Sequence, residues 1–234
     1  MNPPQPDPQW PAARRRYMDL NGKICLVTGA SSGIGYELAL QLAESGATVA
    51  LSARRSEELD ALSARIGPGA TTHPFDLSDP AHALQLADDV VAAHGRVDVL
   101  ASVAGSKVSG PTVALSLDDL DGSFQVNAIS PMALAGRLAP AMVERGEGVI
   151  ATVTTSISGG RRDLSAYAGA KAALASMTQS LRQEIGGKGV AVFAFDPGWV
   201  RTRMSPDGKE EPQDAAARLL AHIAAGRGSR EVLV

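Results

Sequence analysis

The stretch Thr28-Gly29-Ala30-Ser31-Ser32-Gly33-Ile34-Gly35 stands between an apolar run and a segment with helical periodicity. Glycines at this spacing, directly after a predicted strand and at the start of a helix, are typical of a dinucleotide-binding turn. Gly29 allows the tight turn, Gly33 lets the backbone approach a diphosphate, and Gly35 lets helix and strand pack closely. The helix N-terminus offers free N–H groups to the anion. We expect the diphosphate to contact Gly29, Ser31, Ser32, Gly33, Ile34 and Gly35.

On both sides of this turn, from Lys23 onward, short apolar runs alternate with longer amphipathic stretches. The predicted strands are 23–28, 47–52, 71–75, 97–102, 148–154, 190–195 and 230–234. The predicted helices are 33–45, 56–65, 79–94, 116–145 with a break near Gly122, 166–187 and 212–225. Right-handed crossovers turn such a series into an α/β fold with a doubly wound, seven-stranded parallel sheet and helices on both faces. Its ligand crevice lies at the carboxyl ends of the strands.

The first twenty residues differ in composition from the rest. They hold five of the fourteen prolines and the basic triplet 14–16, which favours neither helix nor strand. We therefore predict a flexible tail over 1–20 and one Rossmann-type domain over 21–234.

Charge and composition argue against several classes of partner. The formal net charge of −3 gives no basic field for nucleic acid. No apolar run reaches membrane length, and the N-terminus is polar where a signal peptide needs an apolar core, so we expect no membrane partner and a cytoplasmic location. The four histidines are scattered and the single cysteine, Cys25, lies in an apolar run. We expect no metal site.

The spacing TGxxxGxG differs from GxGxxG and resembles the pattern of the short-chain dehydrogenase/reductase family. The resemblance extends from about Lys23 to about Met204. It implies a Rossmann fold and an oxidoreductase that interconverts a carbonyl and an alcohol with a nicotinamide cofactor.

The end of the second predicted strand bears on the choice of cofactor. An NAD-specific site would place a carboxylate there for the adenosine 2′-hydroxyl, whereas this chain has Ala53-Arg54-Arg55. A guanidinium fits a 2′-phosphate, so Arg54, helped by Arg55, favours NADP(H) over NAD(H). The alternative is that both arginines are simply solvated. The resemblance adds further cofactor-binding residues: Asp76 and Leu77 for the adenine, Ala104 and Gly105 at the centre of the sheet, and Pro197, Gly198, Val200 and Thr202 on the nicotinamide side. The family's asparagine before Ala104 is replaced by Val103.

The segment 167–171, YAGAK, places Tyr167 and Lys171 at i and i+4 on one face of a predicted helix. Reduction of a carbonyl needs a proton for the developing alkoxide, and a tyrosine with an ordinary pKa of roughly 10 needs a shift to exchange it near neutrality. A neighbouring ammonium stabilises tyrosinate. Tyr167 is thus the expected acid in reduction and base in oxidation. The resemblance also implies that Tyr167 and Lys171 both bind the cofactor, with the lysine contacting its ribose.

The family also uses an asparagine in a proton relay and a serine that hydrogen-bonds the substrate carbonyl. Asn127, in Phe-Gln-Val-Asn-Ala, matches the asparagine. The pattern Ser-x-x-Gly selects Ser156 for the serine, whereas counting along the preceding strand selects Thr155. We predict Ser156 and keep Thr155 as the alternative; either hydroxyl can donate to a carbonyl oxygen.

The substrate is poorly constrained by the sequence. The lid segment 203–212 is short, and the loop arginines Arg161 and Arg162 are either solvated or available to a substrate carboxylate or phosphate. Two noncatalytic functions remain as alternatives to an oxidoreductase: a dinucleotide-binding sensor and an oligomeric scaffold. In the family, helices matching 116–145 and 166–187 pair between subunits, which implies a homodimer or homotetramer acting on a small-molecule substrate.

Overall fold

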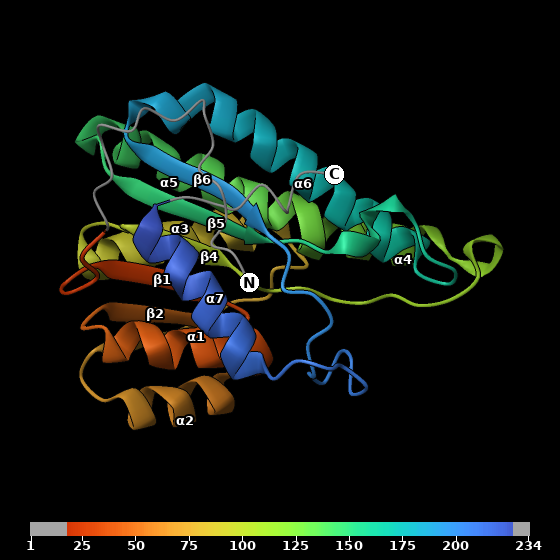
Figure 1. Cartoon of the computed structure of the whole chain (residues 1–234), viewed down its shortest axis with the longest axis horizontal. Helices are drawn as coiled ribbons and strands as arrows, with labels where there is room; N and C mark the ends of the chain where they lie inside the picture. Colours follow the sequence, from red (N-terminus) through yellow and green to blue (C-terminus); the bar gives the residue numbers. More distant parts are fainter. Residues whose placement is uncertain (1–17, 227–234) are drawn as a thin grey trace, which may run out of the picture.

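A six-stranded parallel sheet forms the centre of the computed structural model, which describes residues 18–226 (Figure 1). The strands, in the spatial order β3-β2-β1-β4-β5-β6, are β1 (Ile24–Thr28), β2 (Thr48–Ala53), β3 (Ala70–Pro74), β4 (Val99–Ser102), β5 (Gly148–Val153) and β6 (Val190–Phe195). The predicted α/β class and doubly wound parallel topology are confirmed. Six of the seven predicted strands are present, and the seventh, at 230–234, lies outside the described residues.

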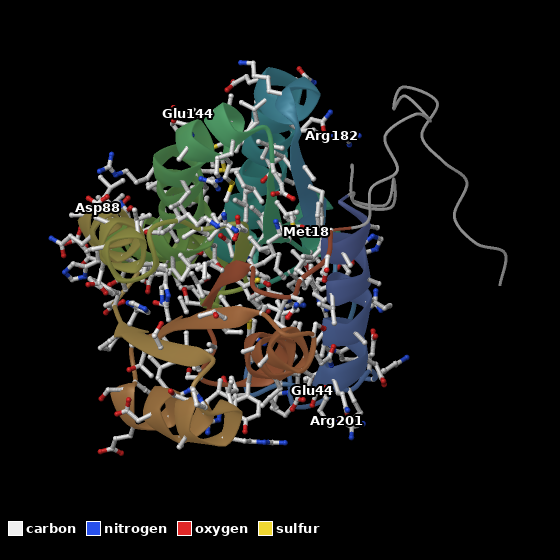
Figure 2. The ribbon with its side chains drawn as sticks, turned by 90° about the vertical axis from the view of Figure 1, so that its left-hand side faces the viewer. Met18, Glu44, Asp88, Glu144, Arg182 and Arg201 are labelled. Carbon is white, nitrogen blue, oxygen red and sulfur yellow. The ribbon has the colours of Figure 1, made fainter. Side chains whose placement is uncertain are left out.

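Helices cover both faces of the sheet, and Figure 2 shows α7 and α3 on opposite sides of it. The α-helices are α1 (Gly33–Glu44), α2 (Ser56–Ile66), α3 (Pro80–His94), α4 (Leu117–Phe124), α5 (Ser130–Arg145), α6 (Ser165–Ile185) and α7 (Pro212–Ala225). One apolar core joins α1, α2 and α7 to the sheet, and a second joins α3 and α5 to its other face. Every residue of β5 and β6 is buried, as expected for parallel strands covered on both faces of the sheet.

The helical region 117–145 runs through a π-helical turn, η3 (Gln125–Ile129), between α4 and α5. The predicted break near Gly122 is therefore wrong in position: Gly122 lies inside α4, where an added Cβ would meet no atom within 4 Å. Pro131 stands in the first turn of α5 and lacks an N–H, so the regular hydrogen-bond ladder cannot pass through it. The irregular turn precedes this proline, and Asn127 lies within it.

Residues 18–20, the described part of the predicted tail, pack against the domain. The Met18 N–H donates to the Ala224 carbonyl at 2.8 Å, and Leu20 is buried in the core beside α1 and α7. Residues 1–17 lie outside the described part of the chain. Within residues 18–226, none of the helices combines the length and the apolarity that a membrane crossing requires.

The strand order reverses between β1 and β4, which are neighbours in the sheet. The chain moves outward from β1 to β3 and then crosses to β4 on the other side of β1, which makes the β1/β4 boundary a topological switch point. The loops after β4, β5 and β6 project from the same edge, on the right of Figure 1. This edge is where the fold places a ligand crevice.

Candidate active site

A cleft of about 800 Å³ opens along the carboxyl ends of the strands. It is lined by residues from the loops after all six strands and from the start of α6. The structure brings nearly all the predicted site residues to its wall: Gly29, Ser31, Ser32, Gly33, Ile34, Gly35, Arg54, Arg55, Asp76, Leu77, Ala104, Gly105, Ser156, Tyr167, Lys171, Pro197, Gly198, Val200 and Thr202. The exception is Asn127, which is fully buried behind the wall.

The glycine-rich turn leaves no room for side chains. Gly29 has φ +71°, and a Cβ there would lie 2.9 Å from the Cα of Ala104. A Cβ on Gly35 would lie 2.4 Å from the Gly29 carbonyl oxygen, so neither position admits a larger residue without movement of the backbone. The first turn of α1 carries no acidic residue, and the Ser32 hydroxyl at its N-cap makes no capping hydrogen bond. The turn therefore presents an open, positively polarised helix end to an anion.

Thr28 holds the sheet centre where the family's asparagine is replaced by Val103. Its Oγ1 accepts hydrogen bonds from the backbone N–H groups of Val103 and Ala104, each at 3.1 Å. The Val103 side chain packs against the apolar core. The polar tie between the first and fourth strands thus comes from β1. Sequence reasoning missed Thr28, although its place before Gly29 was the available signal.

The two arginines after β2 differ in their contacts. Arg55 donates to the Ser31 hydroxyl at 2.9 Å and pairs with Glu58 at 2.8 Å. Arg54 is exposed on the cleft wall and makes no hydrogen bond or ion pair with any other residue of the described range. The arginine at the end of the strand is therefore free to meet a ligand anion, while its neighbour fixes the glycine turn.

Lys171 lines the cleft but is buried, with only 3% of its surface exposed. Its Nζ donates to the Val153 carbonyl at 2.7 Å. Burial lowers the pKa of Lys171 to about 8, because the charged ammonium loses its hydration. A lysine in this state can exchange its proton near neutral pH.

Tyr167 stands one helical turn before Lys171 on α6 and lines the cleft. Burial raises the pKa of Tyr167 above its ordinary value, and the negative charge of Asp196 raises it further. This direction is opposite to the lowering expected from Lys171. Within the chain itself, burial and Asp196 dominate the electrostatics of Tyr167, so activation of this hydroxyl requires additional positive charge in the cleft.

The Asn127 side chain lies behind the cleft wall and binds the loop after β4. Its Nδ2 donates to the carbonyls of Ser106 at 2.8 Å and Ser123 at 2.9 Å, and its Oδ1 accepts from the Ser106 N–H at 3.2 Å. A Cβ on Gly105 would lie 3.0 Å from Asn127 Oδ1 and 3.7 Å from Lys171 Nζ. The Asn127 amide therefore anchors the loop after β4 above the buried lysine, and its hydrogens are both engaged in doing so.

Both candidate hydroxyls lie on the cleft wall. Thr155 is half-buried and caps the short 3₁₀ turn η4 (Ser156–Gly159), its Oγ1 accepting from the Ile157 N–H at 3.5 Å. Ser156 is exposed. Each hydroxyl retains a hydrogen to donate.

The segment after β6 returns to the glycine turn. Asp196 Oδ1 accepts from the Gly198 N–H at 2.9 Å, and Gly198 has φ +76°. The Thr202 side chain lies 3.1 Å from the position of a Cβ on Gly33. The loops after β1 and β6 thus meet across the cleft. No group of three or more histidine, cysteine, aspartate or glutamate side chains within the described residues has a geometry suited to a metal ion.

This parallel sheet, with its glycine turn at the switch point, defines a Rossmann-type dinucleotide-binding protein. The family described as short chain dehydrogenase matches residues 23–213. The chain belongs to this family of oxidoreductases, which bind a nicotinamide dinucleotide and act on small molecules.

Relatives and solved structures agree with this assignment. A short chain dehydrogenase of Pseudocercospora fijiensis is 36% identical over 204 residues, covering 84% of this chain and 66% of the relative, so the chain spans slightly less than two thirds of that protein. A metagenomic short-chain oxidoreductase in complex with NADP aligns with a TM-score of 0.80 and 32% identity, covering 93% of this chain and 96% of the other. A 3-ketoacyl-(acyl-carrier-protein) reductase from Brucella melitensis complexed with NADH aligns with a TM-score of 0.82 and 25% identity, covering 89% and 96%.

Proposed function

We propose that the chain is an NADP(H)-dependent oxidoreductase that interconverts a carbonyl and an alcohol, with Tyr167 as the general acid and base. The observation that carries the proposal is the presence of Tyr167, Lys171 and two hydroxyls on the wall of one cleft together with the glycine turn. Neighbours in the fold bind either NADP or NADH, so the preference for NADP(H) rests on this chain's own residues.

The glycine turn supports binding of the dinucleotide. Backbone atoms occupy the space that a Cβ would fill at Gly29 and Gly35, so this tight turn before α1 requires glycine at both positions. When bound, the reduced cofactor would supply the hydride for the carbonyl carbon of the substrate. Tyr167 donates its proton to the carbonyl oxygen as charge develops there, and recovers it in the reverse direction. Lys171 stabilises the resulting tyrosinate by its charge. Asn127 is a positioning residue, because its side chain holds the loop over Lys171.

A hydroxyl at the end of β5 completes the site by donating to the carbonyl oxygen. We assign this role to Ser156, with Thr155 as the competing candidate. The exposed position of Ser156 on the cleft wall supports the assignment.

Arg54 is the residue proposed to hold the adenosine 2′-phosphate. It stands on the cleft wall, is exposed and has no ion-pair partner within residues 18–226. The remaining contacts proposed for the cofactor are Asp76 and Leu77 for the adenine, and Pro197, Gly198, Val200 and Thr202 for the nicotinamide side.

We further propose a homodimer or homotetramer in which α5 and α6 pair between subunits. Half-buried apolar side chains, among them Phe124, Met132 and Met177, pack against the small buried cluster formed by Ala128, Ala170 and Leu174. Light scattering at several concentrations would detect the assembly, and a monomer throughout would exclude it.

The test follows NADPH and NADH oxidation at 340 nm against ketones, aldehydes and diketones. We expect turnover with NADPH, at a higher kcat/KM than with NADH. Arg54→Gln should lower kcat/KM for NADPH about tenfold and leave NADH unchanged, since only the phosphate contact is lost. Arg65→Gln is the matched control, because Arg65 contacts the Tyr36 hydroxyl outside the cleft. Tight cofactor binding without turnover of any carbonyl would favour the sensor or scaffold interpretation.

A further inference from the structure

The cleft is walled at its catalytic end by three loops, 103–109 after β4, 153–164 after β5 and 197–207 after β6. These loops are joined to one another. The Gly110 N–H donates to the Asp163 carbonyl at 2.9 Å, and Lys107 Nζ donates to the Met204 carbonyl at 2.5 Å. Hydrogen bonds therefore connect the loop after β4 to the loops after β5 and β6 at this end of the cleft.

Basic side chains predominate on these walls. The charged residues that line the cleft from the three loops are Lys107, Arg161, Arg162, Asp163, Arg203 and Asp207. Four are basic and two are acidic, in a chain whose net charge is −3. The substrate end of the cleft is thus locally positive on a protein that is negative as a whole, and this focuses anions toward it.

Two of these arginines have no internal partner. The side chains of Arg161 and Arg203 form no ion pair or hydrogen bond with any residue in the described range, and both residues are exposed. Arg162 faces Asp163 at 3.5 Å, but its side chain is 94% exposed, so this pair neutralises little. Lys107 donates to a carbonyl oxygen, which leaves its charge uncompensated by a carboxylate.

Basic residues just outside the cleft behave differently. Arg201 pairs with Glu211 at 2.8 Å, and Arg218 pairs with Glu210 at 2.8 Å. Lys209 stacks over the Trp199 ring at 5.5 Å. The segment after β6 therefore supplies partners to the basic residues that do not face the cleft, and Arg203, which does face it, has none.

We propose that the substrate carries an anionic oxygen group, a carboxylate or a phosphate, and that Arg161 and Arg203 bind this group while Tyr167 acts on the carbonyl. This inference rests on the proposed function of the same site. The planar guanidinium offers paired N–H donors that match both kinds of oxyanion, and it remains charged at every physiological pH. The two arginines come from different loops, Arg161 from the loop after β5 and Arg203 from the loop after β6, so an anionic group bound by both would fix the orientation of the substrate.

The activity test compares charged substrates with uncharged partners of the same skeleton. Oxo acids of four to eight carbons are measured against their methyl esters, and dihydroxyacetone phosphate against dihydroxyacetone, with NADPH as the reductant. We expect kcat/KM to be at least tenfold higher for one anionic class than for its uncharged partners. The difference should appear as a lower KM, and added salt should reduce it. The double variant R161Q/R203Q should reduce this preference about tenfold and leave the uncharged partners unaffected. Arg201→Gln, whose residue is ion-paired outside the cleft, is the matched control.

A binding test separates this inference from the proposed function. The NADPH-loaded protein is titrated with hexanoate, hexanamide and inorganic phosphate, and cofactor fluorescence reports occupancy. Binding of either anion in preference to hexanamide, weakened at least fivefold in R161Q/R203Q, supports the anion site even if no carbonyl is reduced, in which case the proposed function alone fails. Turnover of esters without preference for either anionic class, together with no binding of either anion, overturns the anion site and leaves the oxidoreductase proposal intact.

Discussion

The cofactor end and the substrate end of the cleft are built by different means. At the first, backbone meets backbone: the Cβ position on Gly35 lies 2.4 Å from the Gly29 carbonyl oxygen, and that on Gly29 lies 2.9 Å from Ala104 Cα. At the second, the wall is made by side chains on three loops, among them Ser156, Arg161 and Arg203, to which we assign roles in binding the substrate. Close backbone contacts admit few sequences, whereas loop side chains can be exchanged without loss of the fold. The difference explains how one fold can keep its cofactor and vary its substrate.

Lys171 gives a large expected effect, because it is buried at the substrate end of the cleft and its charge is proposed to stabilise the tyrosinate. We expect Lys171→Met to lower kcat by about 10²–10⁴-fold, the range typical for loss of assistance to proton transfer. It should not lower the stability in proportion, since the methionine removes a buried charge at the cost of one hydrogen bond to Val153. Steady-state kinetics and thermal unfolding measure the two effects.

The pH dependence of stability tests the same residue. The pKa of Lys171 is about 8 in the folded chain and 10.5 in the reference state, so between these values the unfolded chain binds more protons. Stability therefore rises with pH across this window, by up to ~3 kcal/mol from this group. Lys171→Met should lack that increment in urea titrations between pH 8 and 10. An unchanged slope would show that the folded lysine is not desolvated.

The hydroxyls of Ser156 and Thr155 test the substrate end of the cleft. Ser156→Ala should lower kcat about 10²-fold, as does loss of one donor to a developing oxyanion, and Thr155→Val should have a much smaller effect. The opposite order would transfer the role to Thr155. Equal, small losses would exclude both hydroxyls from the reaction.

Gly33 tests the cofactor end. At φ +60° an alanine adopts a strained conformation, and its Cβ would press on the Thr202 side chain at 3.1 Å. We expect Gly33→Ala to raise the NADPH dissociation constant about tenfold, measured by fluorescence titration. Gly136→Ala is the control, because this α5 position has no atom within 4 Å of the added Cβ. Equal affinity in both variants would show that the turn does not touch the cofactor.

Asp196 gives the smallest expected effect. Its charge raises the pKa of Tyr167, although burial contributes more. Asp196→Asn preserves an oxygen for the Gly198 N–H and removes the charge, so the pKa of Tyr167 should fall. In alcohol oxidation, where tyrosinate is the base, the rise of kcat/KM with pH should move to lower pH. A profile that does not move would mean that Asp196 is neutralised in the working enzyme.

The success of sequence reasoning follows the same division. The parallel sheet and the glycine turn were predictable, because strand burial and backbone crowding leave strong local patterns, and the placement of 19 predicted residues on one cleft wall follows from the topology. Three features were not predicted. Two of them had local signals: the Thr28 tie in the threonine before Gly29, and the π turn in Pro131, which lacks an N–H. The third, the withdrawal of the Asn127 side chain behind the wall, depended on tertiary contacts that no local pattern records. The raised pKa of Tyr167 likewise comes from tertiary structure, first from burial and then from the charge of Asp196, 29 positions away in the sequence.

The most direct test of the account measures binding and turnover in a single variant, Tyr167→Phe. Its backbone-built cofactor end is intact, so the account predicts an NADPH dissociation constant within about threefold of the parent, while kcat for carbonyl reduction falls by about 10³-fold or more. Retained turnover would contradict the assignment of Tyr167 as the acid. Loss of NADPH binding would contradict the division between the two ends of the cleft.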